Sequence, residues 1–167
     1  MKVAIIITDT QVVRFSHLVA LELDERLAGL GLNTSILDLA DPSYELNQLA
    51  SYDYYLLVGN HAGPLYNHET HRLLTNHRAL WRNKKMATVM VTSERILAES
   101  ADEQLRTVLK SLSANLLPEG LMVMEPEKKF DESFNLIDSV LNLAMYRFLF
   151  LLVYGTEAKN GDNRMSA

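Results

Sequence analysis

The 167-residue chain has 48% hydrophobic residues, a net charge of −5 and no cysteine. This length is typical of one compact domain, and the hydrophobic content is enough to bury a core. The lack of cysteine excludes disulfides, thiolate catalysis and cysteine-ligated zinc. The interspersed charges argue against nucleic acid and anionic membranes as partners, because both need a clustered basic face.

The apolar runs are too short for a membrane span or for the core of a signal peptide. Residues 3–7 form a short apolar run, and MYRFLFLLVY at residues 145–154 is interrupted by Arg147. A membrane span needs roughly 20 residues. We therefore expect a cytoplasmic protein, in which the second run is a buried helix face or an oligomer contact.

Hydrophobic patterning predicts strands that alternate with helices along the chain. Residues 3–7 are a continuous apolar run, as expected for a strand covered on both faces of a parallel sheet. Ser16 is placed to cap the helix that follows, and Gly29 and Gly31 are placed to end it. Further strands are predicted at residues 34–39, 54–58, 86–91 and 121–124, and further helices at residues 68–80, from Ser100 in a capping box with Glu103, and from about 133 to 154.

This alternation predicts an α/β fold with five parallel strands, right-handed crossovers and helices on both faces of the sheet. One domain is expected over residues 1–154, followed by a polar tail over residues 155–167 that is expected to be disordered. Ligands bind such sheets beyond the carboxyl ends of the strands. Three loops lie at that edge, over residues 8–16, 59–67 and 92–100.

The first loop, TDTQVVRFS, offers groups that could hold a phosphate. Hydroxyls at Thr8 and Ser16, together with amides at the start of the next helix, could donate to it. Asp9 stands where an anion would lie, and Arg14 is the residue of this loop that could offset its charge. An ordinary polar loop is the alternative.

The segment VGNHAGPLYNHETHRLLTNH, at residues 58–77, holds four of the chain's five histidines. His68 and His71 would share a helix face, but a metal site usually needs a third protein ligand, and the spacing matches no metal signature. We therefore interpret His68, His71 and His77 as solvated helix residues and predict no metal. His61 lies two residues past a strand, where its flat ring could contact a planar ligand. An exposed loop histidine is the alternative.

The whole order of features resembles the NADPH-dependent FMN reductase family, flavodoxin-like flavoproteins that include quinone and chromate reductases. The resemblance covers about residues 2–150 and is carried by YDYYLLVGNHAGPLYNHETHRLL, KKMATVMVTS, EQLRTVLKSLSANLLP and FDESFNLID. In that family the first loop reads Gly-Ser-x-Arg followed by a serine and holds the FMN phosphate. The third-strand loop reads Pro-Glu-Tyr-Asn, and the fourth contains Ser-Gly-Gly. Here Ser16 is retained, and the other positions carry Thr8-Asp9, residues 59–62 and residues 93–95.

The resemblance implies a flavodoxin-like, doubly wound five-stranded sheet and an oxidoreductase that passes electrons from NADPH or NADH through FMN to a small acceptor. It also implies a homodimer or homotetramer. Thr92 and Ser93 would contact the flavin ring edge or ribityl chain. The full set of implied cofactor contacts is Thr8, Asp9, Gln11, Arg14, Ser16, Asn60, His61, Ala62, Gly63, Thr92 and Ser93.

The alternative function is a non-catalytic protein that keeps the scaffold and acts through oligomerisation or partner binding. Its motivation is the apolar final helix, which carries more large side chains than one buried stripe needs. These side chains are Tyr146, Phe148, Phe150, Leu151 and Tyr154.

Overall fold

The computed structural model describes residues 1–10, 14–41, 46–62 and 65–155. Two predicted cofactor contacts, Gln11 and Gly63, lie outside the described residues, as does the predicted tail beyond residue 155. The elements run in the order β1 (Lys2–Ile7), α1 (Phe15–Gly29), β2 (Asn33–Asp38), η1 (Leu46–Ser51), β3 (Tyr54–Gly59), β4 (His61–Ala62), β5 (Leu65–Tyr66), α2 (His68–Asn76), η2 (Arg78–Trp81), β6 (Lys85–Thr92), α3 (Arg95–Ser111), β7 (Asn115–Leu116), β8 (Leu121–Met124), η3 (Pro126–Lys128) and α4 (Ser139–Tyr154).

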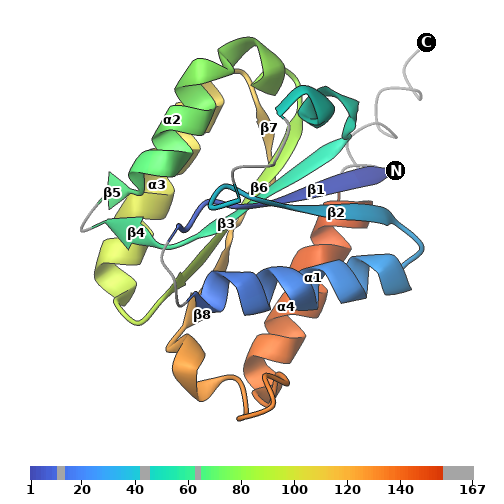
Figure 1. Cartoon of the computed structure of the whole chain (residues 1–167), viewed down its shortest axis with the longest axis vertical. Helices are drawn as coiled ribbons and strands as arrows, with labels where there is room; N and C mark the ends of the chain where they lie inside the picture. The colour runs from blue at the N-terminus through green and yellow to red at the C-terminus, as the bar shows by residue number, and fades with distance from the viewer. Residues whose placement is uncertain (11–13, 42–45, 63–64, 156–167) are drawn as a thin grey trace, which may run out of the picture.

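The main sheet is parallel throughout the described residues and has the strand order β2-β1-β3-β6-β7, with β8 also paired to β6 (Figure 1). From β1 the chain adds β2 on one side of the sheet and then β3 on the other. The switch point of this topology therefore lies between β1 and β3. Both neighbours of β1 end level with it, since Ile7 lies opposite Asp38 on one side and Val58 on the other. This register brings the loops after these strands together.

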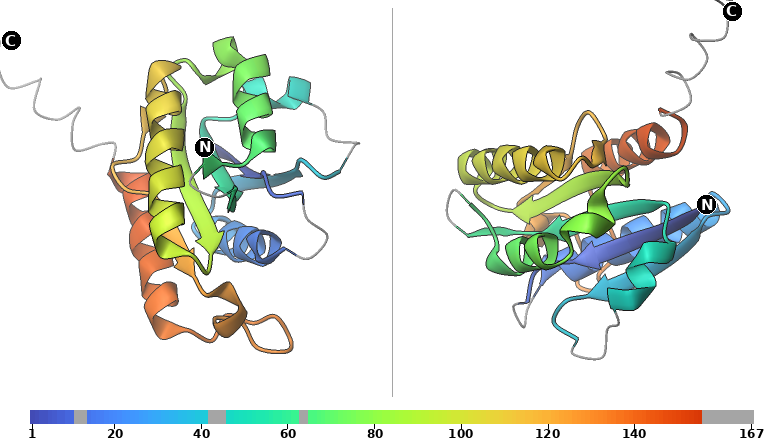
Figure 2. Two further views of the ribbon diagram at one scale, coloured as in Figure 1. Left: turned by 90° about the vertical axis from the view of Figure 1, so that its left-hand side faces the viewer. Right: turned by 90° about the horizontal axis from the view of Figure 1, so that it is seen from above.

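Two hydrophobic clusters fill the two faces of the sheet. Alternate residues of β1 go to opposite clusters, Val3, Ile5 and Ile7 to one and Ala4 and Ile6 to the other, as the two-residue period of a strand requires. The first cluster includes the buried sides of α1 and α4, and the second includes those of α2 and α3. The predicted doubly wound α/β sheet with helices on both faces is confirmed, and Figure 2 shows the layers from two sides.

The fifth position of the sheet is divided between two short strands, where one was predicted. β7 pairs with the start of β6 and β8 with its end, and the chain between them passes through Pro118. Proline has no N–H to give to a strand ladder. At this interruption, Arg106 of α3 donates to the carbonyls of Leu117 (2.8 Å) and Pro118 (2.6 Å) and so gives both acceptors a hydrogen-bond partner.

Helix α3 begins earlier than predicted, and the capping box is wrong. It starts at Arg95, so Ser100 and Glu103 lie inside the helix. Burial explains the earlier start, because Ala98 and Ala101 continue the apolar face that Leu105 belongs to.

Helix α4 begins later than predicted. It starts at Ser139, and the Asp138 side chain caps it by accepting from the Leu141 N–H at 2.6 Å. Upstream, the Asp131 carboxylate accepts from the backbone N–H groups of Ser133 and Asn135, at 2.9 and 2.8 Å. These local bonds replace a helical turn. The region predicted as one helix at 68–80 is likewise α2 followed by the separate turn η2.

Two further features complete the fold. An antiparallel pair, β4 with β5, forms directly after β3 and was not predicted; it joins His61 to Tyr66 and Ala62 to Leu65. Within the described part of the chain, no helix has the length and apolar character that crossing a bilayer requires.

Candidate functional site

The candidate site is the rim, defined here as the carboxyl ends of β1, β3 and β6 with the loops that follow them. Thr8 and Asp9 follow β1, Asn60 and His61 follow β3, and Thr92 ends β6. The rim lies at the switch point between β1 and β3, the place where this strand order positions a ligand.

The centre of the rim is tied together by Asn67, which comes just before α2. Its amide Nδ2 donates to Thr8 Oγ1 at 3.2 Å and to the Asn60 carbonyl at 3.3 Å. Its Oδ1 accepts from the Thr70 N–H at 2.8 Å and thereby caps α2. One side chain therefore fixes the ends of β1 and β3 and the start of a helix. The sequence analysis did not single out Asn67, although asparagine is a preferred N-cap residue.

Gly59 lets β3 approach Thr8 closely. A Cβ at this position would lie 2.2 Å from Thr8 Oγ1, far inside van der Waals contact. Thr8 is itself buried, and its N–H donates to the Val58 carbonyl at 2.8 Å. Any side chain at residue 59 would therefore push the two strand ends apart.

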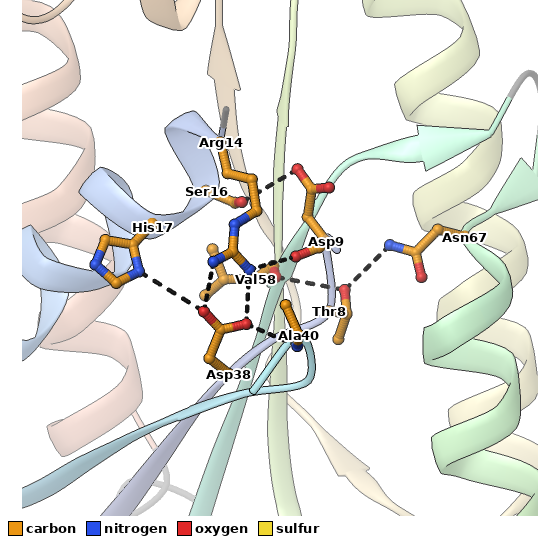
Figure 3. Close-up of polar contacts among 9 residues, drawn as sticks. All are labelled: Thr8, Asp9, Arg14, Ser16, His17, Asp38, Ala40, Val58 and Asn67. Atoms are coloured by element: carbon orange, nitrogen blue, oxygen red, sulfur yellow. Dashed lines mark hydrogen bonds and ion pairs between the residues drawn. The ribbon is translucent and has the colours of Figure 1, made fainter. Parts of the chain in front are cut away.

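Arg14 holds the loop after β1 against the end of β2. Its Nη1 and Nη2 donate to the two oxygens of Asp38, each at 2.6 Å, and Nη1 also donates to the Asp9 carbonyl at 2.8 Å (Figure 3). The expectation that Arg14 offsets the charge of Asp9 stays a prediction; the strongest contact that the structure shows for Arg14 is the one with Asp38. The register makes this contact possible, because it places Asp38 opposite Ile7 at the end of β1.

This pair perturbs both of its members. The hydrogen bond that Arg14 donates to Asp38 raises the pKa of Arg14, and the negative charges of Asp38 and Asp9 add to that effect against the opposing effect of burial. Burial alone would raise the pKa of Asp38, but the hydrogen bonds from Arg14 and from the Ala40 N–H outweigh it and lower that pKa. His17 Nδ1 lies 4.0 Å from the same carboxylate.

The start of α1 carries a buried carboxylate. Asp9 is 6% exposed and Ser16 is 1% exposed, and the serine Oγ donates to Asp9 Oδ2 at 3.2 Å. Ser16 therefore does not cap α1, whose N-cap is Arg14 without a side-chain hydrogen bond. Thr8 and Ser16, the residues expected to bind phosphate, both lie here, but the hydroxyl of Ser16 donates to Asp9 and the hydroxyl of Thr8 accepts from Asn67.

The other half of the rim joins the loops after β3 and β6. His61 Nε2 lies 2.8 Å from Thr92 Oγ1, which also accepts from the Glu94 N–H at 3.1 Å. Ser93 is exposed, and its Oγ donates to Glu127 of η3 at 3.1 Å, a partner that the sequence did not indicate.

A pocket of about 720 Å³ lies beside the rim, between β5, α2 and α3. Tyr66 and His71 stack at its wall with ring centroids 5.9 Å apart, and the tyrosine hydroxyl lies 2.9 Å from His71 Nδ1. The complete lining is Leu65, Tyr66, His68, His71, Ser100, Glu103, Gln104, Thr107 and Val108. Across the described ranges, no group of three or more His, Asp or Glu residues is arranged to hold a metal ion.

Comparison with known proteins identifies the fold. No family model and no curated protein matches the sequence. Among solved structures, a flavodoxin from Streptococcus pneumoniae TIGR4 has 13% identity and a TM-score of 0.68, covering 92% of this chain and 98% of the flavodoxin. FerB from Paracoccus denitrificans, a flavoenzyme NAD(P)H:(acceptor) oxidoreductase, has 15% identity and a TM-score of 0.72, covering 91% and 94%. Oxidised flavodoxin 1 from Bacillus cereus has 16% identity and a TM-score of 0.68, covering 92% and 97%.

These similarities confirm the predicted flavodoxin-like fold. Membership of the NADPH-dependent FMN reductase family stays a prediction, as do the assigned cofactor contacts. What the structure does show is their placement. Thr8, Asp9, Arg14 and Ser16 gather at the end of β1, while Asn60, His61, Ala62, Thr92 and Ser93 follow β3 and β6 along the same edge.

Replacing Gly59 by alanine should destabilise the fold by about 1–3 kcal/mol, because the new methyl group overpacks against Thr8. Gly29→Ala is the matched control, since a Cβ there meets nothing within 4 Å and the helix gains up to about 1 kcal/mol in propensity. Urea unfolding measures both changes. Adding Thr8→Ala to Gly59→Ala should restore part of the loss, and no rescue would contradict the clash.

The Arg14–Asp38 pair should make stability depend on pH. Because folding lowers the pKa of Asp38, the pair's contribution is present above the unfolded value of about 4 and is lost as the pH falls through the lower folded value. Asp38→Asn should therefore lower the unfolding free energy by about 1–2 kcal/mol at neutral pH, and this difference should shrink below about pH 4.

Urea unfolding from about pH 7 to about pH 3 measures this difference. Asp53→Asn, at an exposed carboxylate before β3, removes the same charge at the opposite edge of the sheet and serves as the control. A loss in Asp38→Asn that stays constant across this range would contradict the assignment.

Proposed function

We propose that this chain is a flavin-dependent oxidoreductase that passes electrons from NADPH or NADH through a bound flavin to a small acceptor. The meeting of three loops at the rim carries the proposal, with His61 hydrogen-bonded to Thr92 and Asn67 joining Thr8 to Asn60. In flavodoxin, a doubly wound sheet with this strand order binds FMN at its β1/β3 switch point. The likeness of the fold to FerB and to flavodoxins supports the same function.

The ring half of a flavin suits the groups at the rim. His61 offers a flat ring, Thr92 a hydroxyl and Asn60 a backbone carbonyl, which match the planar ring and polar edge of an isoalloxazine and the hydroxyls of a ribityl chain. A bound flavin would supply the redox chemistry, while these residues would bind and orient it. The phosphate of FMN fits less well, because Asp9 places a carboxylate at the start of α1.

The neighbouring pocket suits an uncharged, planar electron acceptor of the quinone type. Leu65 and Val108 give it apolar walls, and Tyr66 and His71 give it an aromatic one. Glu103 adds a carboxylate, which disfavours phosphate-bearing molecules there. Its volume of about 720 Å³ lies in the range of small-molecule sites.

A second candidate function is self-association through α4, with or without flavin chemistry. Val140, Leu143, Tyr146, Phe150 and Tyr154 recur at helical spacing and are each exposed, by 75%, 52%, 58%, 61% and 49%. A group of large exposed apolar side chains of this kind, with the exposed Arg147 among them, marks an interaction surface more often than a free one. A second copy of the chain is the occupant that we propose, as a homodimer or, if a further surface is used, a homotetramer.

Purified protein that carries or takes up flavin should show the flavin absorbance bands. His61→Ala should then weaken flavin binding by about fivefold, through loss of one hydrogen-bonded edge contact. His77→Ala is the control, because His77 lies at the far end of α2 from the rim. Fluorescence titration with riboflavin and with FMN measures both variants. Equal effects would misplace the site, and a lack of binding by either flavin would remove the proposed function.

Light scattering coupled to size exclusion should give twice the monomer mass or more for the native chain. Phe150→Glu should yield monomers, because it buries a charge in the proposed contact. Ile96→Glu, at an 81% exposed residue of α3, should leave the mass unchanged. A native monomer, or equal masses for native protein and Phe150→Glu, would rule out association through α4.

A further inference from the structure

The loop after β1 places a negative charge where a flavin phosphate would have to bind. The N-terminus of a helix that follows a strand at this edge is normally a favourable site for an anion. Here the buried Asp9 carboxylate already lies within hydrogen-bonding distance of Ser16, the second residue of α1. A phosphate in the same place would have to approach a carboxylate of like charge.

The positively charged residue of this loop is bound to the carboxylate at the end of β2. Arg14 is the one cationic residue in the segment 8–16, and both arms of its guanidinium bind Asp38 at 2.6 Å (Figure 3). The same guanidinium also binds the backbone carbonyl of Asp9, while the carboxylate of Asp9 accepts from Ser16. His17 Nδ1 lies 4.0 Å from Asp38 and so faces the same negative side.

Riboflavin and FMN differ in the group at the end of the ribityl chain, which is a hydroxyl in riboflavin and a phosphate in FMN. A phosphate group only accepts hydrogen bonds when fully ionised, and it repels a neighbouring carboxylate. A terminal ribityl hydroxyl can donate to that carboxylate. The ring half of the site, at His61 and Thr92, is the same for both ligands.

We propose that the rim selects an unphosphorylated flavin of the riboflavin class over FMN, and that Asp9 sets this preference. The inference rests on the proposed flavin-binding function and specifies the form of flavin. Asp9 acts here as a specificity-determining residue, through its charge and its capacity to accept a hydrogen bond from the ribityl end.

The test is a pair of fluorescence titrations, with riboflavin and with FMN, on the native chain and three variants. The native chain should bind riboflavin about tenfold or more tightly than FMN, since a like charge at close range has an effect of this size. Asp9→Asn keeps an acceptor for Ser16 but removes the charge, and it should reduce that ratio by about tenfold, mainly by improving FMN binding.

Asp38→Asn tests the same idea from the other side. It releases Arg14 from its bidentate partner, so FMN affinity should again rise relative to riboflavin. Asp53→Asn removes a carboxylate at the opposite edge of the sheet and should leave the ratio unchanged. Circular dichroism verifies that each variant is folded, and Asp38→Asn decides the question if Asp9→Asn does not fold.

The outcomes distinguish a failure of this inference from a failure of the proposed flavin-binding function. Native protein that binds FMN as tightly as riboflavin, or a ratio that folded Asp9→Asn leaves unchanged, overturns the inference while flavin binding stands. Failure of both flavins to bind the native chain overturns the proposed function and the inference together.

Discussion

The ion pair between Arg14 and Asp38 shapes the rim, because it fastens the loop after β1 to the end of β2. The parallel register makes the pair possible by placing Ile7 opposite Asp38. Arg14 also binds the carbonyl of Asp9, and the carboxylate of Asp9 accepts from Ser16. One guanidinium therefore links the residue after Thr8 to the end of β2.

The rim consequently has two halves with different chemistry. On the β1 side, the hydroxyl of Ser16 donates to the carboxylate of Asp9, and the guanidinium of Arg14 binds Asp38 and the Asp9 carbonyl. On the side of β3 and β6, the contact between His61 and Thr92 crosses from one loop to the next and borders the pocket region near β5. Under the proposed function, the side of β3 and β6 would contact the flavin ring, and the side of β1 would contact the end of the ribityl chain. Electron transfer and self-association through α4 are compatible with it, since α4 covers the sheet face and not the rim.

The sequence predicted the strands well because their signal is local. Residues 3–7 and 54–58 are apolar runs buried on both faces, and each observed strand lies within one residue of its predicted bounds. Helix starts were less predictable. The hydroxyl of Ser16 donates to Asp9 and does not cap α1, and burial of Ala98 extends α3 toward its N-terminus, beyond Ser100.

The contacts within the site were the least predictable part. The rim loops could be placed from the strand order alone, and their main residues do lie there. The contact between Arg14 and Asp38 could not be predicted, because the two residues lie 24 positions apart and meet only through the register of the strands. The link between Ser93 and Glu127 spans 34 residues and has no local signature either.

The divided fifth position has a consequence for the behaviour of the chain in crowded solution. This position is one border of the sheet, where backbone groups face outward without a neighbouring strand. A long, regular border would be a template for pairing between molecules. The break at Pro118, held by the carbonyl contacts of Arg106, leaves two segments of two and four residues in place of one long strand. These short segments offer a second molecule little regular border with which to pair.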